Sequence, residues 1–188
     1  MDNLKELLEE QLQDLYNAEK QLVKALPAMA KKALTPSLGE AIRMHLDETN
    51  KQVQRLETIG ESLGIRLTGK KCKAMEGLIE EGKEVLKEKG RSSIIDAALI
   101  AAAQRVEHYE ISAYGSARTL AEHLGHNEVR GLLQETLDEE SAADEKLTQI
   151  CLNDVLPDAE TGDEEEEQEE PEEEVQKPVK RVISHTRR

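Results

Sequence analysis

Residues 132–151, LLQETLDEESAADEKLTQIC, combine the periodicity of an amphipathic helix with two charges in an unusual position. The apolar side chains recur at the three-and-four spacing of one helical face, and they are Leu133, Leu137, Leu147 and Cys151. Glu140 and Asp144 fall on the centre of that face. A carboxylate buried without a partner costs several kcal/mol, so both are expected to receive a proton or a cation. A wet rim of a bundle would explain either one alone, so the hypothesis depends on matching carboxylates from other helices.

The composition predicts an all-α protein of one domain. The 188 residues contain no Phe or Trp and three Tyr, while 37% of them are hydrophobic. A core of that composition must be built from Leu, Ile, Val and Ala, the side chains of close-packed helices. The length is that of a single domain with a modest core.

Periodicity and capping signals predict four long helices. Their approximate ranges are 4–34, 37–63, 93–124 and 128–152. Pro27 predicts a kink or local break in the first helix. Ser37 and Glu40 have the spacing of a capping box at the start of the second helix, and Ser92 or Ser93 would cap the third.

The connection between the second and third helices is long enough to cross the bundle. Gly64 is placed to end the second helix, and a short helix is expected within residues 74–89. The first two helices then form one antiparallel hairpin and the last two another. The expected fold is therefore a ferritin-like antiparallel four-helix bundle with a crossover between its second and third helices.

A change of composition near Pro157 divides the chain into two regions. We expect a folded domain over residues 1–157 and a tail over residues 158–188, in which an acidic run precedes a basic segment. Such a run repels itself and buries nothing, so the tail should be disordered. Alternatively, residues 179–188 dock into a protein partner or onto the acidic domain itself.

Charge and cysteine content restrict the partners and the compartment. A net charge of −15 at pH 7 opposes contact with nucleic acid or anionic membranes, but it is compatible with cation binding. Two unpatterned cysteines fit a reducing compartment. The N-terminus alternates charge and leucine, unlike a signal peptide, and no stretch approaches the roughly 20 apolar residues of a membrane span. We therefore expect a cytoplasmic protein.

Every predicted long helix offers at least one carboxylate to the interior. Glu19 and Glu110 lie inside the apolar arcs of their helices, and Glu48 and Glu107 lie at the edges of theirs. Four such helices provide what a dinuclear metal site requires, because two divalent cations need bridging oxygen ligands. The usual Glu-x-x-His pairs are absent: Lys51 lies three residues after Glu48, although His45 precedes Glu48 by one turn.

Four segments together resemble a known family. They are LQDLYNAEKQL, MHLDETNKQVQRLE, RVEHYEISAYG and LLQETLDEESAADEKL, at residues 12–22, 44–57, 105–115 and 132–147. In this order they resemble the YciE/YciF family of bacterial ferritin-like proteins, a domain of unknown function, over about residues 3–155. The resemblance implies a four-helix ferritin-like bundle, often dimeric, linked to stress responses and related to rubrerythrin-type di-iron proteins.

The resemblance also implies a set of ligands for two divalent metal ions, with iron expected first and manganese as the alternative. Carried over position by position, the candidate ligands are Glu19, Glu48, Glu107, Glu110, Glu140 and Asp144. Glu139 is the rival of Glu140. Family members commonly carry His where this chain has Gln52, and an amide is a weaker ligand than imidazole.

Two classes of function follow from this pattern. The first is ferroxidase or peroxide-consuming chemistry at a carboxylate-rich dinuclear site in a stress-response protein. The second is a non-enzymatic structural or stress protein with a degenerate site that holds no metal. A homodimer is expected in either case.

Overall fold

The computed structural model describes residues 2–161 of the chain, and all of the regular secondary structure in this range is helical. The elements are α1 (Leu4–Lys32), α2 (Pro36–Leu63), α3 (Lys73–Lys87), α4 (Ser92–His123), α5 (Asn127–Ile150) and a π-helical turn, η1 (Cys151–Val155). This confirms the all-α prediction. None of these helices combines the length and apolarity needed to cross a membrane.

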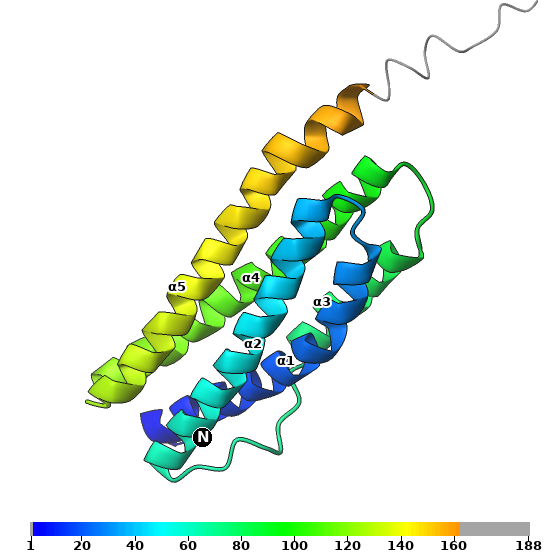
Figure 1. The fold of residues 1–188 in the computed structure, drawn as a ribbon. Coiled ribbons are helices and arrows are strands. Elements are labelled where there is room, and N and C mark those ends of the chain that lie inside the picture. The colour runs from blue at the N-terminus through cyan, green and yellow to red at the C-terminus, as the bar shows by residue number, and fades with distance from the viewer. Residues whose placement is uncertain (1, 162–188) are drawn as a thin grey trace, which may run out of the picture.

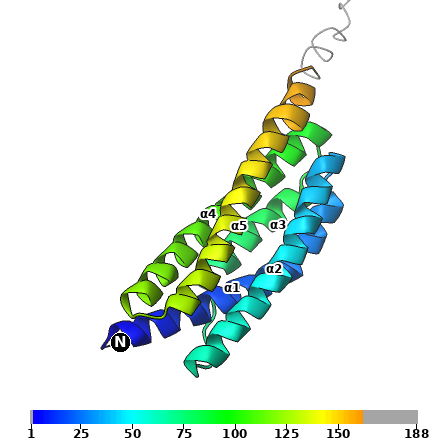
Figure 2. The same ribbon diagram turned by 60° about the vertical axis from the view of Figure 1, so that its left-hand side comes forward.

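The long helices form two antiparallel hairpins, α1 with α2 and α4 with α5 (Figures 1 and 2). The chain leaves the end of α2, returns along the bundle through α3, and enters α4 at the opposite end. α3 packs against α1 and α4, and the hairpins meet where α1 contacts α4 and α2 contacts α5. The bundle with a crossover between its hairpins is therefore confirmed, with a short helix in the crossover as expected.

Helix boundaries confirm some of the local predictions and correct others. Gly64 ends α2 in the left-handed conformation, with φ of 65°, which glycine adopts without steric cost. The predicted capping box is wrong, because α2 begins at Pro36, whose missing N–H needs no acceptor at that position. Ser37 lies inside the first turn, and its hydroxyl donates to Asp154 at 2.5 Å.

The predicted break and the predicted serine cap are also wrong. α1 continues through Pro27, and the residues that follow, Met29 and Ala30, are buried in the core. Tertiary packing of this last turn outweighs the helix-breaking tendency of proline. α4 begins at Ser92 after Arg91, without a side-chain cap.

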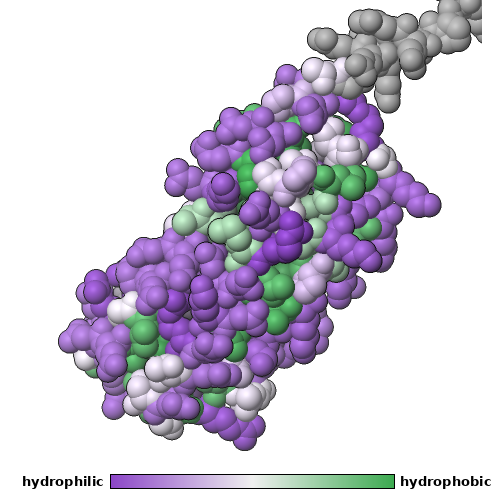
Figure 3. Space-filling view, in the orientation of Figure 1, coloured by the Kyte–Doolittle hydropathy of each residue, from purple (hydrophilic) through white to green (hydrophobic). Residues whose placement is uncertain are grey.

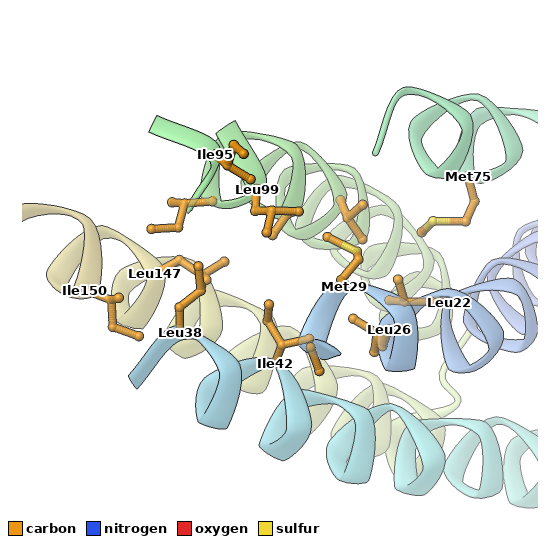
Figure 4. Close-up of a cluster of buried hydrophobic side chains, with 14 of the residues drawn as sticks. Leu22, Leu26, Met29, Leu38, Ile42, Met75, Ile95, Leu99, Leu147 and Ile150 are labelled. Atoms are coloured by element: carbon orange, nitrogen blue, oxygen red, sulfur yellow. The ribbon is translucent and has the colours of Figure 1, made fainter. Parts of the chain in front are cut away.

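The core consists of two apolar clusters, one toward each end of the bundle. The first cluster, part of which is shown in Figure 4, includes Leu22, Leu26, Leu38, Ile42, Leu99 and Leu147. The second cluster includes Leu8, Leu12, Leu15, Leu56, Tyr114 and Leu133. On every long helix, the residues between these two sets include a buried polar side chain. The bundle therefore has a polar layer between two apolar ones.

The C-terminal end of the bundle is longer than predicted. The helical conformation continues past the expected end near Leu152, through the π-helical turn, to Thr161. Val155 and Ala159 are buried there, so this segment packs as part of the bundle, and residues 158–161 of the predicted tail are helical. Disorder of the tail and docking of residues 179–188 concern a part of the chain outside the described residues.

Candidate metal centre

The polar layer arises because each long helix interrupts its apolar stripe at the same height in the bundle. On α1, Glu19 lies between Leu15 of one apolar cluster and Leu22 of the other. Similar positions on α4 and α5 hold Glu107, Glu110 and Glu140. The four carboxylates are at most 2% exposed. Helical periodicity thus brings four acids into the buried interior of the bundle.

Four of the side chains in this layer converge on one point. His45, Glu107, Glu110 and Glu140 each offer a ligand atom, and these atoms all lie within 4.8 Å of one another. His45 Nε2 is 3.5 Å from Glu107 Oε1 and 4.0 Å from Glu140 Oε2. Ligand atoms that share a cation at about 2.1 Å lie roughly 3–4 Å apart. The four side chains are therefore close to the spacing of a coordination sphere.

Most polar atoms of the layer have no hydrogen-bond partner. The unpartnered atoms are Glu19 Oε2, both ring nitrogens of His45, Gln52 Oε1, Glu107 Oε2, both carboxylate oxygens of Glu110 and Glu140 Oε2. Buried polar atoms are nearly always hydrogen-bonded in folded proteins. One imidazole with several carboxylates is a donor set that suits Fe(II), Mn(II) and similar cations. The residues present therefore fit a divalent metal ion.

Burial sets the protonation states of this layer. Desolvation, followed by repulsion between the acids, raises the pKa of Glu19, Glu107 and Glu110 well above the ordinary value. Burial likewise raises the pKa of Glu140 to about 7. It lowers the pKa of His45 to about 4. His45 is therefore neutral at pH 7 and can act as a nitrogen ligand, while the carboxylates need protons or a cation.

Glu19 lies beside the four converging side chains. One of its oxygens accepts a hydrogen bond from the Tyr114 hydroxyl at 2.5 Å. Repulsion from Glu140 contributes, after burial, to its raised pKa. Glu19 is thus oriented by Tyr114 and keeps one oxygen unpartnered.

Glu48 and Asp144 were both predicted as ligands, but they lie outside the group of four converging side chains. The Glu48 side chain is 37% exposed, and its Oε2 lies 3.9 Å from Nδ1 of His45. Asp144 is half-buried and accepts a hydrogen bond from Gln104 Nε2 at 3.0 Å. Its Oδ1 also lies 3.4 Å from His108 Nε2. Of the six nominated residues, the structure brings Glu107, Glu110 and Glu140 together. Glu19 lies beside them, and Glu48 and Asp144 lie outside.

Glu139 and Glu140, the two rival ligands, differ in their surroundings. Glu140 is fully buried, whereas Glu139 forms a two-armed ion pair with Arg55 at 2.9 and 3.0 Å. Gln52 joins the two, because its Nε2 donates to Glu140 at 2.5 Å and to Glu139 at 3.0 Å. Gln52 therefore orients Glu140 while Arg55 neutralises Glu139.

His45 was not predicted as a ligand from the sequence, and neither Gln52 nor Tyr114 was predicted as a positioning residue. A signal for two of them was present, because His45 and Gln52 lie on the buried stripe of α2 with Ile42 and Leu56. The usual ligand pattern in such bundles is a histidine three residues after a glutamate. Here the histidine precedes Glu48 by one turn instead.

Comparison with known proteins gives a consistent result. Protein YciF of Escherichia coli K12 is 48% identical over 150 residues, which are 79% of this chain and 90% of that protein. The crystal structure of the E. coli stress protein YciF matches with a TM-score of 0.80 at 46% identity, covering 82% of this chain and 98% of that one. YcfI from Rhodopseudomonas palustris matches with a TM-score of 0.76 at 41% identity, covering 79% and 94%.

A more distant structure shares only the fold. A Xanthomonas campestris protein matches with a TM-score of 0.66 at 22% identity, covering 86% of this chain and 99% of that one.

The family described as a domain of unknown function, DUF892, matches residues 3–160. These residues include all the helices and the whole buried polar layer. The chain belongs to the DUF892 family, the family of the YciF proteins.

Proposed function

We propose that the buried polar layer is a metal centre that binds iron or manganese, and that the chain acts as a ferritin-like stress protein with oxidant-consuming chemistry. The observation that carries this proposal is the set of unpartnered atoms on His45, Glu107, Glu110 and Glu140. Within residues 2–161, no lysine or arginine forms an ion pair with these carboxylates. A divalent cation would satisfy them and offset their mutual repulsion.

Each residue has a defined task in such a centre. Neutral His45 supplies a nitrogen ligand, and Glu107, Glu110 and Glu140 supply oxygen ligands. Glu19, held by Tyr114, is the buried carboxylate that remains for a second ion. Bound iron or manganese would supply one-electron redox chemistry toward dioxygen or hydrogen peroxide. The apolar clusters on both sides lower the local dielectric and so strengthen the electrostatic interactions within the layer.

Gln52 favours a second candidate function, a stress protein whose site holds no metal. Its amide donates to Glu140 at 2.5 Å, so a neutral group already occupies part of the space beside that carboxylate. In this alternative the remaining carboxylates are protonated, as their raised pKa values permit.

Metal analysis with a matched pair of variants distinguishes the candidates. The protein should be purified without chelator, and the metal-free form should be titrated with Fe(II) or Mn(II) under anaerobic conditions. Glu140→Gln changes a ligand, whereas Glu139→Gln makes the same substitution at the neighbouring residue that pairs with Arg55. We expect about two ions per chain in the parent protein, strong loss in Glu140→Gln and retention in Glu139→Gln. Absence of binding in the parent protein would favour the metal-free alternative.

A further inference from the structure

A pocket of ≈ 630 Å³ extends into the bundle from the groove between α2 and α5. Its outer lining includes exposed residues of these two helices, such as Met44 and Lys146. Its inner lining includes buried residues of α1 and α4. Figure 3 shows hydrophobic surface among hydrophilic side chains on the face that carries α2 and α5. The pocket therefore passes from the surface to the interior.

The pocket ends at the candidate metal centre. His45 and Glu107, two of the four converging side chains, belong to its lining. The remaining inner walls are aliphatic and consist of Leu26, Met29, Ile42, Ala103, Ala143 and Leu147. A volume of several hundred Å³ with apolar walls and a few polar groups at one end is typical of small-molecule sites. A molecule bound here would touch the centre with one end.

Charge at the mouth restricts the chemistry of that molecule. Four acidic side chains line the mouth, at Glu48, Glu135, Asp138 and Glu139, against one basic side chain, Lys146. Arg55 pairs with Glu135 and Glu139, which still leaves Glu48 and Asp138 against Lys146. A carboxylate or phosphate ligand would therefore meet net repulsion at the mouth.

We propose that this pocket binds an organic molecule that has an apolar body and no anionic group, and holds it against the candidate metal centre. The inference deepens the proposed function, since it assigns that centre an organic substrate class. The binding step itself depends only on the pocket. It can therefore be tested in metal-free protein, separately from metal binding.

A second copy of the chain is the less suitable occupant. Met44 is the large hydrophobic residue exposed at the mouth, at 57%. Apart from Leu4 at the start of α1, the other large exposed apolar residues lie toward the end of the bundle where the α1–α2 turn meets the end of α5. These residues are Leu34, Ile94, Leu152 and Leu156. That end is the better candidate for the predicted homodimer contact.

A matched pair of fluorescent probes tests the proposal. N-phenyl-1-naphthylamine is uncharged, and 1-anilinonaphthalene-8-sulfonate adds a sulfonate to the same aromatic body. We expect the uncharged probe to bind metal-free protein with about one molecule per chain and at least about tenfold more tightly than the sulfonate. Equal binding of both probes, or no binding of the uncharged probe, would overturn the proposal.

Variants locate the bound probe. Ala143→Phe fills the pocket, whereas Ala101→Phe adds the same ring at an exposed position of α4 outside it. We expect at least about a tenfold loss of affinity for the uncharged probe in the first variant and no change in the second. Asp138→Lys, at the mouth, should raise the affinity for the sulfonate severalfold without affecting the uncharged probe. This variant provides a test even if Ala143→Phe fails to fold.

Metal content and molar mass of the same variants separate the remaining outcomes. Probe binding without metal binding would leave the pocket assignment intact and reject the metal centre. Metal binding without probe binding would reject the pocket assignment alone. If Ala143→Phe converts a dimer to a monomer and leaves probe binding unchanged, the groove is a contact between copies and the proposal is wrong.

Discussion

Two buried carboxylates on the same helix, Asp96 and Glu110, have opposite surroundings. Both are 0% exposed. Asp96 accepts hydrogen bonds from the backbone N–H of Leu34 at 3.0 and 3.2 Å and from that of Thr35 at 2.6 Å. Neither oxygen of Glu110 has a partner. The backbone of the α1–α2 turn supplies the hydrogen-bond donors for Asp96. These bonds join α4 to that turn. Glu110 receives no donor, which is the property expected of a ligand.

The largest effect should come from removing the satisfied carboxylate. Asp96→Ala leaves the N–H groups of Leu34 and Thr35 buried without acceptors, and we expect a loss of about 3 kcal/mol in the free energy of unfolding. Urea denaturation of metal-free protein provides the measurement. As a control, folded Asp96→Ala protein titrated with Fe(II) or Mn(II) should bind as much metal as the parent protein. A loss below about 0.5 kcal/mol would mean that Asp96 does not support the turn.

Removing the unsatisfied carboxylate should have the opposite sign. Glu110→Leu replaces an acid without hydrogen bonds by an apolar side chain, so metal-free protein should gain about 1–2 kcal/mol of stability at pH 8. The same substitution should abolish metal binding, which anaerobic titration would detect. Destabilisation of the metal-free variant would show that Glu110 contributes to the fold as Asp96 does.

The stability of the metal-free protein should also depend on pH, because buried groups of the polar layer have shifted pKa values. Burial raises the pKa of Glu140 to about 7 in the folded state. Below the pKa that Glu140 has in the unfolded chain, its contribution to the free energy of unfolding is complete. This contribution is lost as pH rises through about 7. His45 acts oppositely below pH 6.5, since its pKa is lowered to about 4. Above pH 6.5 the titration of Glu140 alone should therefore destabilise metal-free protein by about 1 kcal/mol up to pH 8. The other three buried carboxylates, whose pKa values are also raised, add to this loss in the same direction.

Thermal unfolding across that pH range is the measurement, with metal-loaded protein as the control. Bound metal replaces the protons on its ligands, so the stabilisation that it provides should grow with pH. Metal-free protein that gains stability between pH 6.5 and 8 would contradict the assigned protonation states.

The smallest effects should come from the nominated residues that lie outside the converging group. Asp144→Asn keeps the shape of a side chain whose partner is Gln104, and Glu48→Gln changes a partly exposed side chain. We expect less than about a threefold change in metal affinity for either variant. A loss as large as that of Glu140→Gln would place the changed residue among the ligands.

Local sequence patterns are sufficient to predict the helices, their hairpin order and the identity of the deepest carboxylates. Hydrophobic periodicity is a local property of each helix, so the inward direction of Glu19, Glu110 and Glu140 could be calculated without any partner. Gly64 was predictable for the same reason, because a left-handed helix end is a local backbone requirement. Caps at Ser37 and Ser92 were mispredicted where packing of the turns decided the first helical residue.

Packing between the helices sets which residues at the edges of the apolar stripes are buried. Glu48 and Glu107 both lie at such edges, yet Glu107 is 2% exposed and the Glu48 side chain 37% exposed. Asp144 lies on the stripe of α5 but contacts Gln104 of α4 instead of the centre. The stripe of a straight helix drifts around its axis, and the rotation and crossing of the packed helices set where each edge residue points. The convergence of His45 with three carboxylates results from that packing, since it depends on three helices at once.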